Sequence, residues 1–165
     1  MIPFGFGLSY SSFSYSLSQT PPQKRVSLEA LRRLLKSSTG FLKASELDEA
    51  MKSGWQAGYA VNVTNTGKRD ADDVVLGFLV PPKAGQDGIP LKTLFGFQRV
   101  HVKAGATETV WLYPSLKDFA RVGARGELEL HEGEYRVQFG VPETHGAGMG
   151  FVEDTLMAVE PVAYI

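Results

Sequence analysis

From residue 59 onward, apolar and polar side chains alternate with a period of two, which is typical of β-strands with one buried face. In one example, Tyr59, Val61 and Val63 alternate with Ala60, Asn62 and Thr64. In the stretch 107–113, Val110 and Leu112 share one face, and Trp111 and Tyr113 share the other. Gly, Pro and Asn residues between the alternating stretches supply turns. The predicted strands cover residues 11–18, 59–64, 74–80, 94–102, 107–113, 127–130, 135–141 and 154–160. This series of short strands predicts an all-β fold, a sandwich of two sheets.

Two stretches depart from this alternation. Residues 74–80 are almost continuously apolar, so we expect a central strand that is buried on both faces and ends at Pro81 and Pro82. Residues 115–122 predict a helical turn.

Residues 19–55 change character and predict a short helical insertion. Ser27 is suited to cap a helix whose apolar side chains share one face, namely Leu28, Leu31, Leu34 and Leu35. Gly40 is suited to end that helix, and residues 45–51 predict a second short one. We expect the insertion to lie on the sandwich. The alternative is a basic amphipathic helix that binds a membrane or a partner helix.

The first 23 residues carry no charge, although they include Phe4, Phe6 and Tyr10. The predicted strand at 11–18 does not account for the apolar residues 1–10. We therefore expect this leader to pack on a surface outside this chain. No basic region precedes an apolar stretch here, so we expect no signal peptide, and the localisation stays open.

Composition excludes several kinds of site and argues against several kinds of partner. Seventeen Lys and Arg against eighteen Asp and Glu give a net charge of −1, so we expect no nucleic-acid partner. No apolar run is long enough to predict a membrane span. The absence of cysteine excludes disulfides, zinc–thiolate sites and thiol nucleophiles. A chain of 165 residues with 43% hydrophobic residues is expected to form one domain with its own core.

No constellation of residues predicts catalysis, a metal or a cofactor. His101, His131 and His145 are scattered, and the glycine-rich residues 146–150 lack the helix and the lysine of a phosphate-binding loop. Glu127 and Glu129 would lie about 6.5–7 Å apart on one strand face, a spacing that alone does not make an acid/base pair.

Ordered motifs along the chain resemble the C-terminal fibronectin type III-like domain of glycoside hydrolase family 3. Pro-Phe-Gly-Phe-Gly-Leu-Ser-Tyr at residues 3–10 is similar to the family's junction between an α/β sandwich domain and that C-terminal domain. The further matching motifs lie at residues 61–67, 73–76, 90–100, 104–107 and 132–137. The Pro81-Pro82 loop with Gly85 favours the β-xylosidase branch over the β-glucosidase branch.

The resemblance implies a non-catalytic accessory domain in an immunoglobulin/fibronectin type III-like β-sandwich. Residues 1–10 would be the junction with an α/β domain, and residues 11–165 the sandwich, with the helical insertion at about 19–55. The family's catalytic carboxylates lie in upstream domains, so no catalytic, cofactor-binding or metal-binding residue maps onto this chain, and we expect it to be inactive alone. Parent enzymes of this type are often secreted.

Two details of this resemblance can be tested against a structure. Tyr135, which follows Gly133 and Glu134, is placed to form a tyrosine corner, in which the hydroxyl group bonds back to the backbone. The upstream catalytic domains are the expected partner, and carbohydrate is a second candidate partner. A stand-alone carbohydrate-binding or interaction module is the alternative function, with Trp55 and Trp111 as candidate stacking residues.

Overall fold

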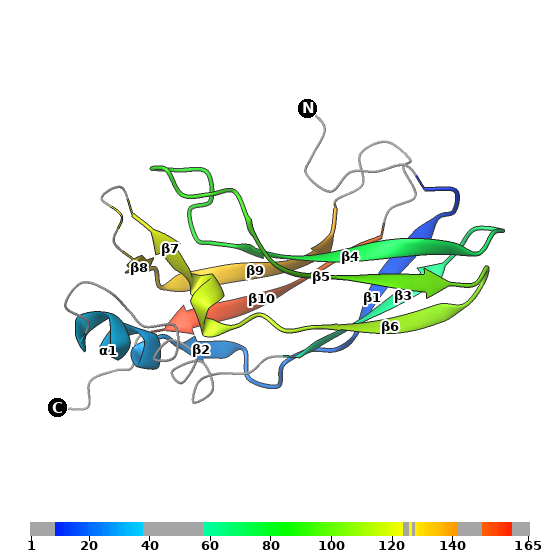
Figure 1. The fold of residues 1–165 in the computed structure, drawn as a ribbon. Helices are drawn as coiled ribbons and strands as arrows, with labels where there is room; N and C mark the ends of the chain where they lie inside the picture. The colour runs from blue at the N-terminus through cyan, green and yellow to red at the C-terminus, as the bar shows by residue number, and fades with distance from the viewer. Residues whose placement is uncertain (1–8, 38–57, 124–125, 127, 142–149, 160–165) are drawn as a thin grey trace.

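The computed structural model describes residues 9–37, 58–123, 126, 128–141 and 150–159, and these residues form a β-sandwich (Figure 1). One sheet has the strand order β1-β3-β6 and the other the order β2-β10-β9-β4-β5. The small sheet contains β1 (Phe13–Gln19), β3 (Tyr59–Asn65) and β6 (Thr107–Leu112). The large sheet contains β2 (Arg25–Ser27), β4 (Ala71–Val80), β5 (Thr93–Val102), β9 (Gly133–Gly140) and β10 (Phe151–Val159). The expected all-β sandwich is confirmed.

Short elements complete the fold. The 3-10 helix η1 (Leu116–Phe119) leads into a hairpin of β7 (Ala120–Val122) and β8 (Leu128–Leu130). The predicted helical turn is therefore confirmed for its first half, and a strand replaces its second half. No helix in the described part of the chain is long and apolar enough to cross a membrane.

Within the insertion, a strand that was not predicted precedes the helix. β2 pairs in parallel with β10, and its last partners are Ser27 and Val159. The helix α1 (Glu29–Ser37) follows, and the Ser27 hydroxyl accepts a hydrogen bond from the Glu29 backbone N–H (3.4 Å). Leu28 and Leu31 are buried in the core, so this part of the insertion lies on the sandwich as expected. Gly40 and the second predicted helix lie outside the described residues.

The inward side chains of both sheets form one core. They include Val61 and Val63 from β3, Val110 from β6 and Val137 from β9, each at most 1% exposed. The alternation that predicted these strands thus separates buried from exposed positions. In β4 the prediction was partly wrong, because Val74 is 41% exposed while residues 77–80 are buried. A register shift between Gly77 and Phe78 divides the two halves.

Tyr135 forms the tyrosine corner that its sequence context predicts. Its ring is 2% exposed and packs edge-on against Phe119, and its hydroxyl donates a hydrogen bond to the His131 backbone oxygen (2.9 Å). Burial raises the pKa of Tyr135 to about 12, so the hydroxyl keeps its proton at neutral pH. The bond ties the start of β9 to the residues that precede it.

We expect Tyr135→Phe to lower the free energy of unfolding by about 1–3 kcal/mol, because the His131 carbonyl oxygen loses its donor. Urea unfolding followed by circular dichroism measures the change. Tyr113→Phe is the matched control, since that side chain is 64% exposed. An equal effect of the two substitutions would exclude a special role for the corner.

Candidate functional site

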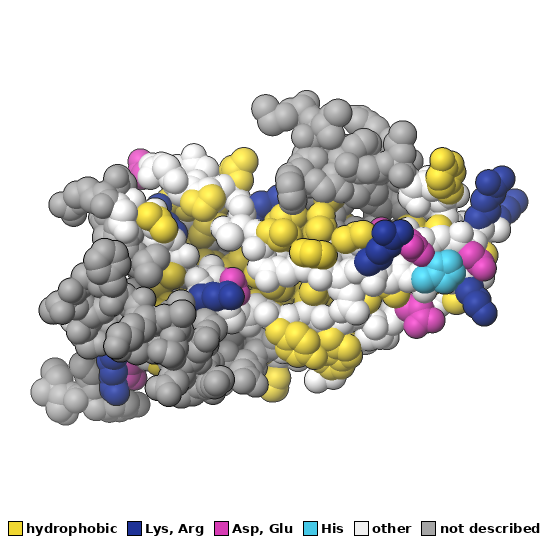
Figure 2. Space-filling view, in the orientation of Figure 1, with side chains coloured by type: hydrophobic (Ala, Val, Ile, Leu, Met, Phe, Trp, Pro, Cys, Tyr) yellow, Lys and Arg dark blue, Asp and Glu magenta, His cyan; other side chains and the backbone are white. Residues whose placement is uncertain are grey.

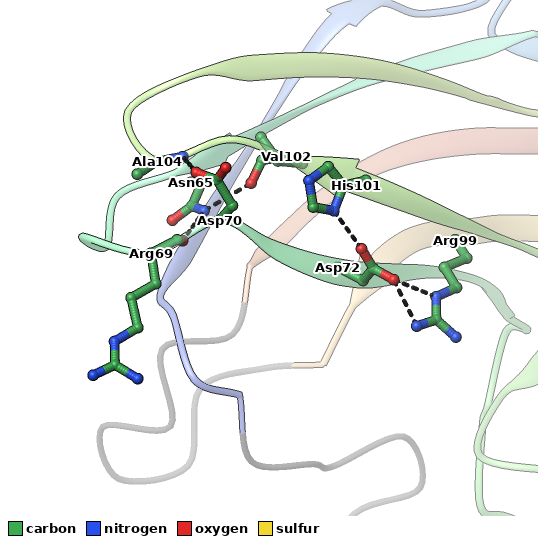
Figure 3. A network of polar contacts seen from close by, with 8 residues as sticks. All are labelled: Asn65, Arg69, Asp70, Asp72, Arg99, His101, Val102 and Ala104. Carbon is green, nitrogen blue, oxygen red and sulfur yellow. Dashed lines mark hydrogen bonds and ion pairs between the residues drawn. The ribbon is translucent and has the colours of Figure 1, made fainter.

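The Asn65 side chain fixes one end of the sandwich. It is fully buried, and its Oδ1 accepts hydrogen bonds from the Ser11 hydroxyl (2.6 Å) and the Gly67 N–H (3.0 Å). Its Nδ2 donates to the backbone oxygens of Arg69 (2.8 Å) and Val102 (2.9 Å), as Figure 3 shows. These four bonds use both acceptor sites and both donor hydrogens of the amide. The predicted Asn-Thr-Gly turn is therefore also the link between three separate segments.

The first described residues are bound to the same turn. The Ser12 backbone oxygen accepts hydrogen bonds from the Thr66 N–H (2.8 Å) and the Thr66 hydroxyl (3.1 Å). A Cβ atom at Gly67 would lie 2.0 Å from the Ser11 hydroxyl oxygen, so this close contact requires glycine. Residues 11 and 12 are thus fixed against the sandwich at the place where the leader joins it. Residues 1–8 lie outside the described part of the chain.

A charged group lies on the outer side of β4 and β5 at this end. The Asp72 carboxylate accepts hydrogen bonds from Arg99 Nε (2.9 Å) and Nη2 (2.6 Å), and it contacts His101 Nδ1 (2.6 Å) (Figure 3). The hydrogen bond from His101 and those from Arg99 hold the pKa of Asp72 below its usual range. Asp72 therefore carries its charge at neutral pH.

Exposed apolar side chains accompany this charged group on the same two strands. Val74 is 41%, Leu94 39% and Phe97 67% exposed. Figure 2 shows hydrophobic side chains beside the charged end of the molecule. We name this the β4–β5 surface, formed by Asp72, Val74, Leu94, Phe97, Arg99 and His101. It has the mixture of apolar and charged groups that protein interfaces use.

The strand β5 is also an edge of the large sheet. Within the described residues it pairs only with β4, so its other side has no strand partner in the sheet. A strand edge of this kind can pair with another strand unless something covers it. The edge and the exposed Phe97 together favour burial of this surface against another body.

The candidate acid Glu129 has a structural role. Arg121 donates from Nε to His131 Nε2 (2.6 Å), and its Nη2 lies 2.5 Å from Glu129 Oε2. The His131 ring and the Arg121 guanidinium hold the pKa of Glu129 below its usual range. An ionised carboxylate cannot donate the proton that a general acid must supply. Glu127 lies outside the described residues.

A hollow of about 350 Å³, part of it open to solvent, borders this ion pair. Asp118 is the carboxylate that lines it, and it accepts hydrogen bonds from the Ser115 backbone N–H (2.7 Å) and the Ser115 hydroxyl (2.8 Å), which caps η1. Asp118 thus stabilises local structure. Within the described ranges, no three His, Asp or Glu side chains come together as metal ligands.

The candidate stacking residue Trp111 lies on the opposite side of the sandwich. It is 39% exposed on the outer face of the small sheet, and its ring is parallel to that of Tyr113 within 12°, with the centroids 6.1 Å apart. Alternation predicted that Trp111 and Tyr113 share the face opposite Val110, whereas the exposure of that face and the stacking of the two rings needed the structure. Trp55, His145 and residues 146–149 lie outside the described residues.

Comparison with known proteins gives a consistent result. A family model described as the fibronectin type III-like domain matches residues 73–141. The chain is 36% identical over 146 residues to "Beta-D-xylosidase 1" of Arabidopsis thaliana, covering 85% of this chain and 19% of that protein. It is 35% identical over 144 residues to a "Probable exo-1,4-beta-xylosidase" of Aspergillus clavatus, covering 87% and 17%. The chain thus spans under a fifth of the length of these relatives.

Solved structures agree with the fold. A β-glucosidase from Erythrobacter marinus superimposes with a TM-score of 0.64 at 25% identity, covering 95% of this chain and 17% of that one. A β-glucosidase from Listeria innocua in complex with isofagomine superimposes with a TM-score of 0.65 at 21% identity, covering 96% and 18%. In each case the sandwich corresponds to a minor part of a much larger chain.

We expect Asn65→Ala to lower the free energy of unfolding by about 2–4 kcal/mol, because it leaves buried groups of Gly67, Arg69 and Val102 without partners. Urea unfolding measures the change. Asn62→Ala is the matched control on the same strand, with a half-buried amide that accepts one hydrogen bond from Thr109. A loss below about 1 kcal/mol for both variants would contradict the central role of Asn65.

We expect the stabilisation from Glu129 to depend on pH. A lowered pKa in the folded state makes the contribution complete above the ordinary value of 4.5 and lost as the pH falls through the lower folded value. Glu129→Gln should therefore melt below the parent chain at neutral pH, and the two should converge in acid. Glu134→Gln, at an exposed position on β9, is the control. A difference that persists unchanged into strong acid would contradict this assignment.

Proposed function

This chain belongs to the fibronectin type III-like domains of glycoside hydrolase family 3, and we propose that it acts as a non-catalytic accessory domain that braces the catalytic domains of such an enzyme. The β4–β5 surface is the side that faces them. The parent enzyme would release xylose or glucose units from β-linked substrates, as the names of the relatives suggest. The catalytic domains are supplied by the same chain or by a separate one.

The main support is the exposed, partly apolar edge of the large sheet. A Phe side chain that becomes buried contributes about 1.5–3 kcal/mol, so covering Phe97 alone favours docking. The Asp72–Arg99–His101 group beside it provides the charged rim that fixes how two bodies meet. Such an arrangement is typical of a surface that contacts another protein, as the surface of an accessory domain does.

The fixed start of the sandwich supports the same role. Because Ser11 and Ser12 are hydrogen-bonded to the Asn65 turn, a preceding domain would be attached through a short, oriented junction instead of a loose tether. We propose residues 1–10 as that junction, with residues 11–165 as the accessory domain. We further propose that the domain borders the substrate entrance of the enzyme.

Catalysis in this proposal resides in the other domains. Glu129 is engaged in an ion pair, and the carboxylates that the family uses belong to upstream motifs. The chain therefore contributes orientation and stability to the catalytic domains, and it contributes no acid, base or nucleophile.

A chimera tests this proposal. The matched region of the Arabidopsis xylosidase is replaced by this chain, and hydrolysis of an aryl β-xyloside is followed after incubation at rising temperature. We expect the chimera to be active, the same enzyme without the domain to be inactive or short-lived, and the isolated chain to release no phenol. Phe97→Asp in the chimera should lower the temperature of half-inactivation by at least about 2 °C.

Val122→Asp is the matched control for the chimera, because it adds the same charge at an apolar position of similar exposure (68%) on β7. We expect it to leave the inactivation temperature unchanged. Equal losses for Phe97→Asp and Val122→Asp would exclude the β4–β5 surface as the docking side. Phenol release by the isolated chain would overturn the accessory role itself.

A further inference from the structure

We propose that the outer face of the small sheet binds a neutral oligosaccharide. This face lies on the opposite sheet from the β4–β5 surface, so sugar binding does not depend on the docking role. Its parts are a pair of parallel aromatic rings and rows of hydroxyl and amide groups beside them. We name it the β1–β3–β6 face.

The ring pair provides the apolar part of the site. Trp111 and Tyr113 are 39% and 64% exposed, and their rings are parallel within 12°. Figure 2 shows hydrophobic side chains standing out along the lower edge of the view, where Figure 1 draws β6. Pyranose rings present C–H groups on their faces, which pack against exposed aromatic rings. The two rings stack with their centroids 6.1 Å apart, so they form one continuous apolar surface for such packing.

Gly58 makes room for this pair. A Cβ atom at this position would lie 3.1 Å from the Tyr113 ring and 3.2 Å from the Trp111 ring. Any larger residue would press on both rings at once. Both rings therefore pack against the Gly58 backbone, and this contact restrains their orientation before a ligand binds.

Rows of polar groups cross the sheet next to the rings. The register aligns Ser16, Asn62 and Thr109 in one row, and Ser14, Thr64 and Thr107 in the next. The Thr109 hydroxyl donates to Asn62 Oδ1 (2.8 Å), which leaves the Asn62 amide nitrogen as the donor of that side chain. The hydroxyl groups of Thr64 and Thr107 lie 2.7 Å apart. Hydroxyl and amide groups of this kind match the alternating donors and acceptors of sugar hydroxyls.

The charge of this face selects the class of ligand. Charged residues make up 21% of the chain, yet the outward positions of β1, β3 and β6 carry Ser, Thr, Asn, Ala and Trp side chains. An acidic or basic ligand would find no countercharge there, whereas a neutral sugar chain needs none. The opposite sheet, with Asp72 and Arg99, presents the contrasting surface.

Fluorescence titration tests the proposal on the whole chain. The chain contains two tryptophans, so Trp55→Phe leaves Trp111 as the reporter. Xylohexaose and cellohexaose are added, with oligogalacturonate as a charged comparison. We expect a saturable change in Trp111 emission with at least one neutral hexasaccharide and none with the acidic one. Absence of any change up to the solubility limit of both neutral sugars would overturn the proposal.

Matched variants locate the site, with binding measured by calorimetry. Trp111→Ala should lower the association constant at least about tenfold, and Trp111→Phe, which keeps an aromatic ring, should lower it less. Phe97→Ala removes an exposed aromatic ring from the opposite sheet and should leave binding unchanged. An equal loss for Trp111→Ala and Phe97→Ala would show non-specific adhesion and refute the assignment. Circular dichroism confirms that each variant is folded.

Discussion

The buried amide of Asn65 is the interaction on which the rest of the structure depends. It joins the start of β1, the turn before β4 and the end of β5, although Ser11 lies 54 residues before Asn65 in the sequence and Val102 lies 37 residues after it. Apolar packing holds the two sheets together without specifying their register, whereas four directional hydrogen bonds in a dry environment permit only one arrangement. The attachment of residues 11 and 12 and the position of the β4–β5 surface both follow from it.

The sequence predicted most of the strands because period-two alternation is a local property of residues such as those of β3, β6 and β9. It missed β2 and β7, because three residues carry no measurable period and pair only where a neighbouring strand exists. Alternation also predicted that Trp111 lies on the face opposite Val110. The exposure of Val74 was not predicted, because a continuous apolar run does not show which residues of a strand are exposed to solvent.

The two outer faces of the sandwich differ in charge and in the chemical groups that a partner would contact. The β4–β5 surface combines apolar side chains, paired charges and an unpaired sheet edge, all of which favour contact with protein. The β1–β3–β6 face is uncharged and carries hydroxyl groups beside two parallel rings. Under the two proposals above, one small domain would contact catalytic domains on one side and a sugar chain on the other.

The position of β10 bears on how the domain is made in the cell. This late strand lies between β9 and the early strand β2 in the large sheet. While the ribosome is still translating the region before residue 151, β2 therefore has no neighbour to join, and Leu28 and Leu31 have an incomplete core to enter. Native closure of the sandwich must wait until β10 has left the exit tunnel. Nascent chains of this domain would thus spend most of their synthesis with apolar segments available to chaperones.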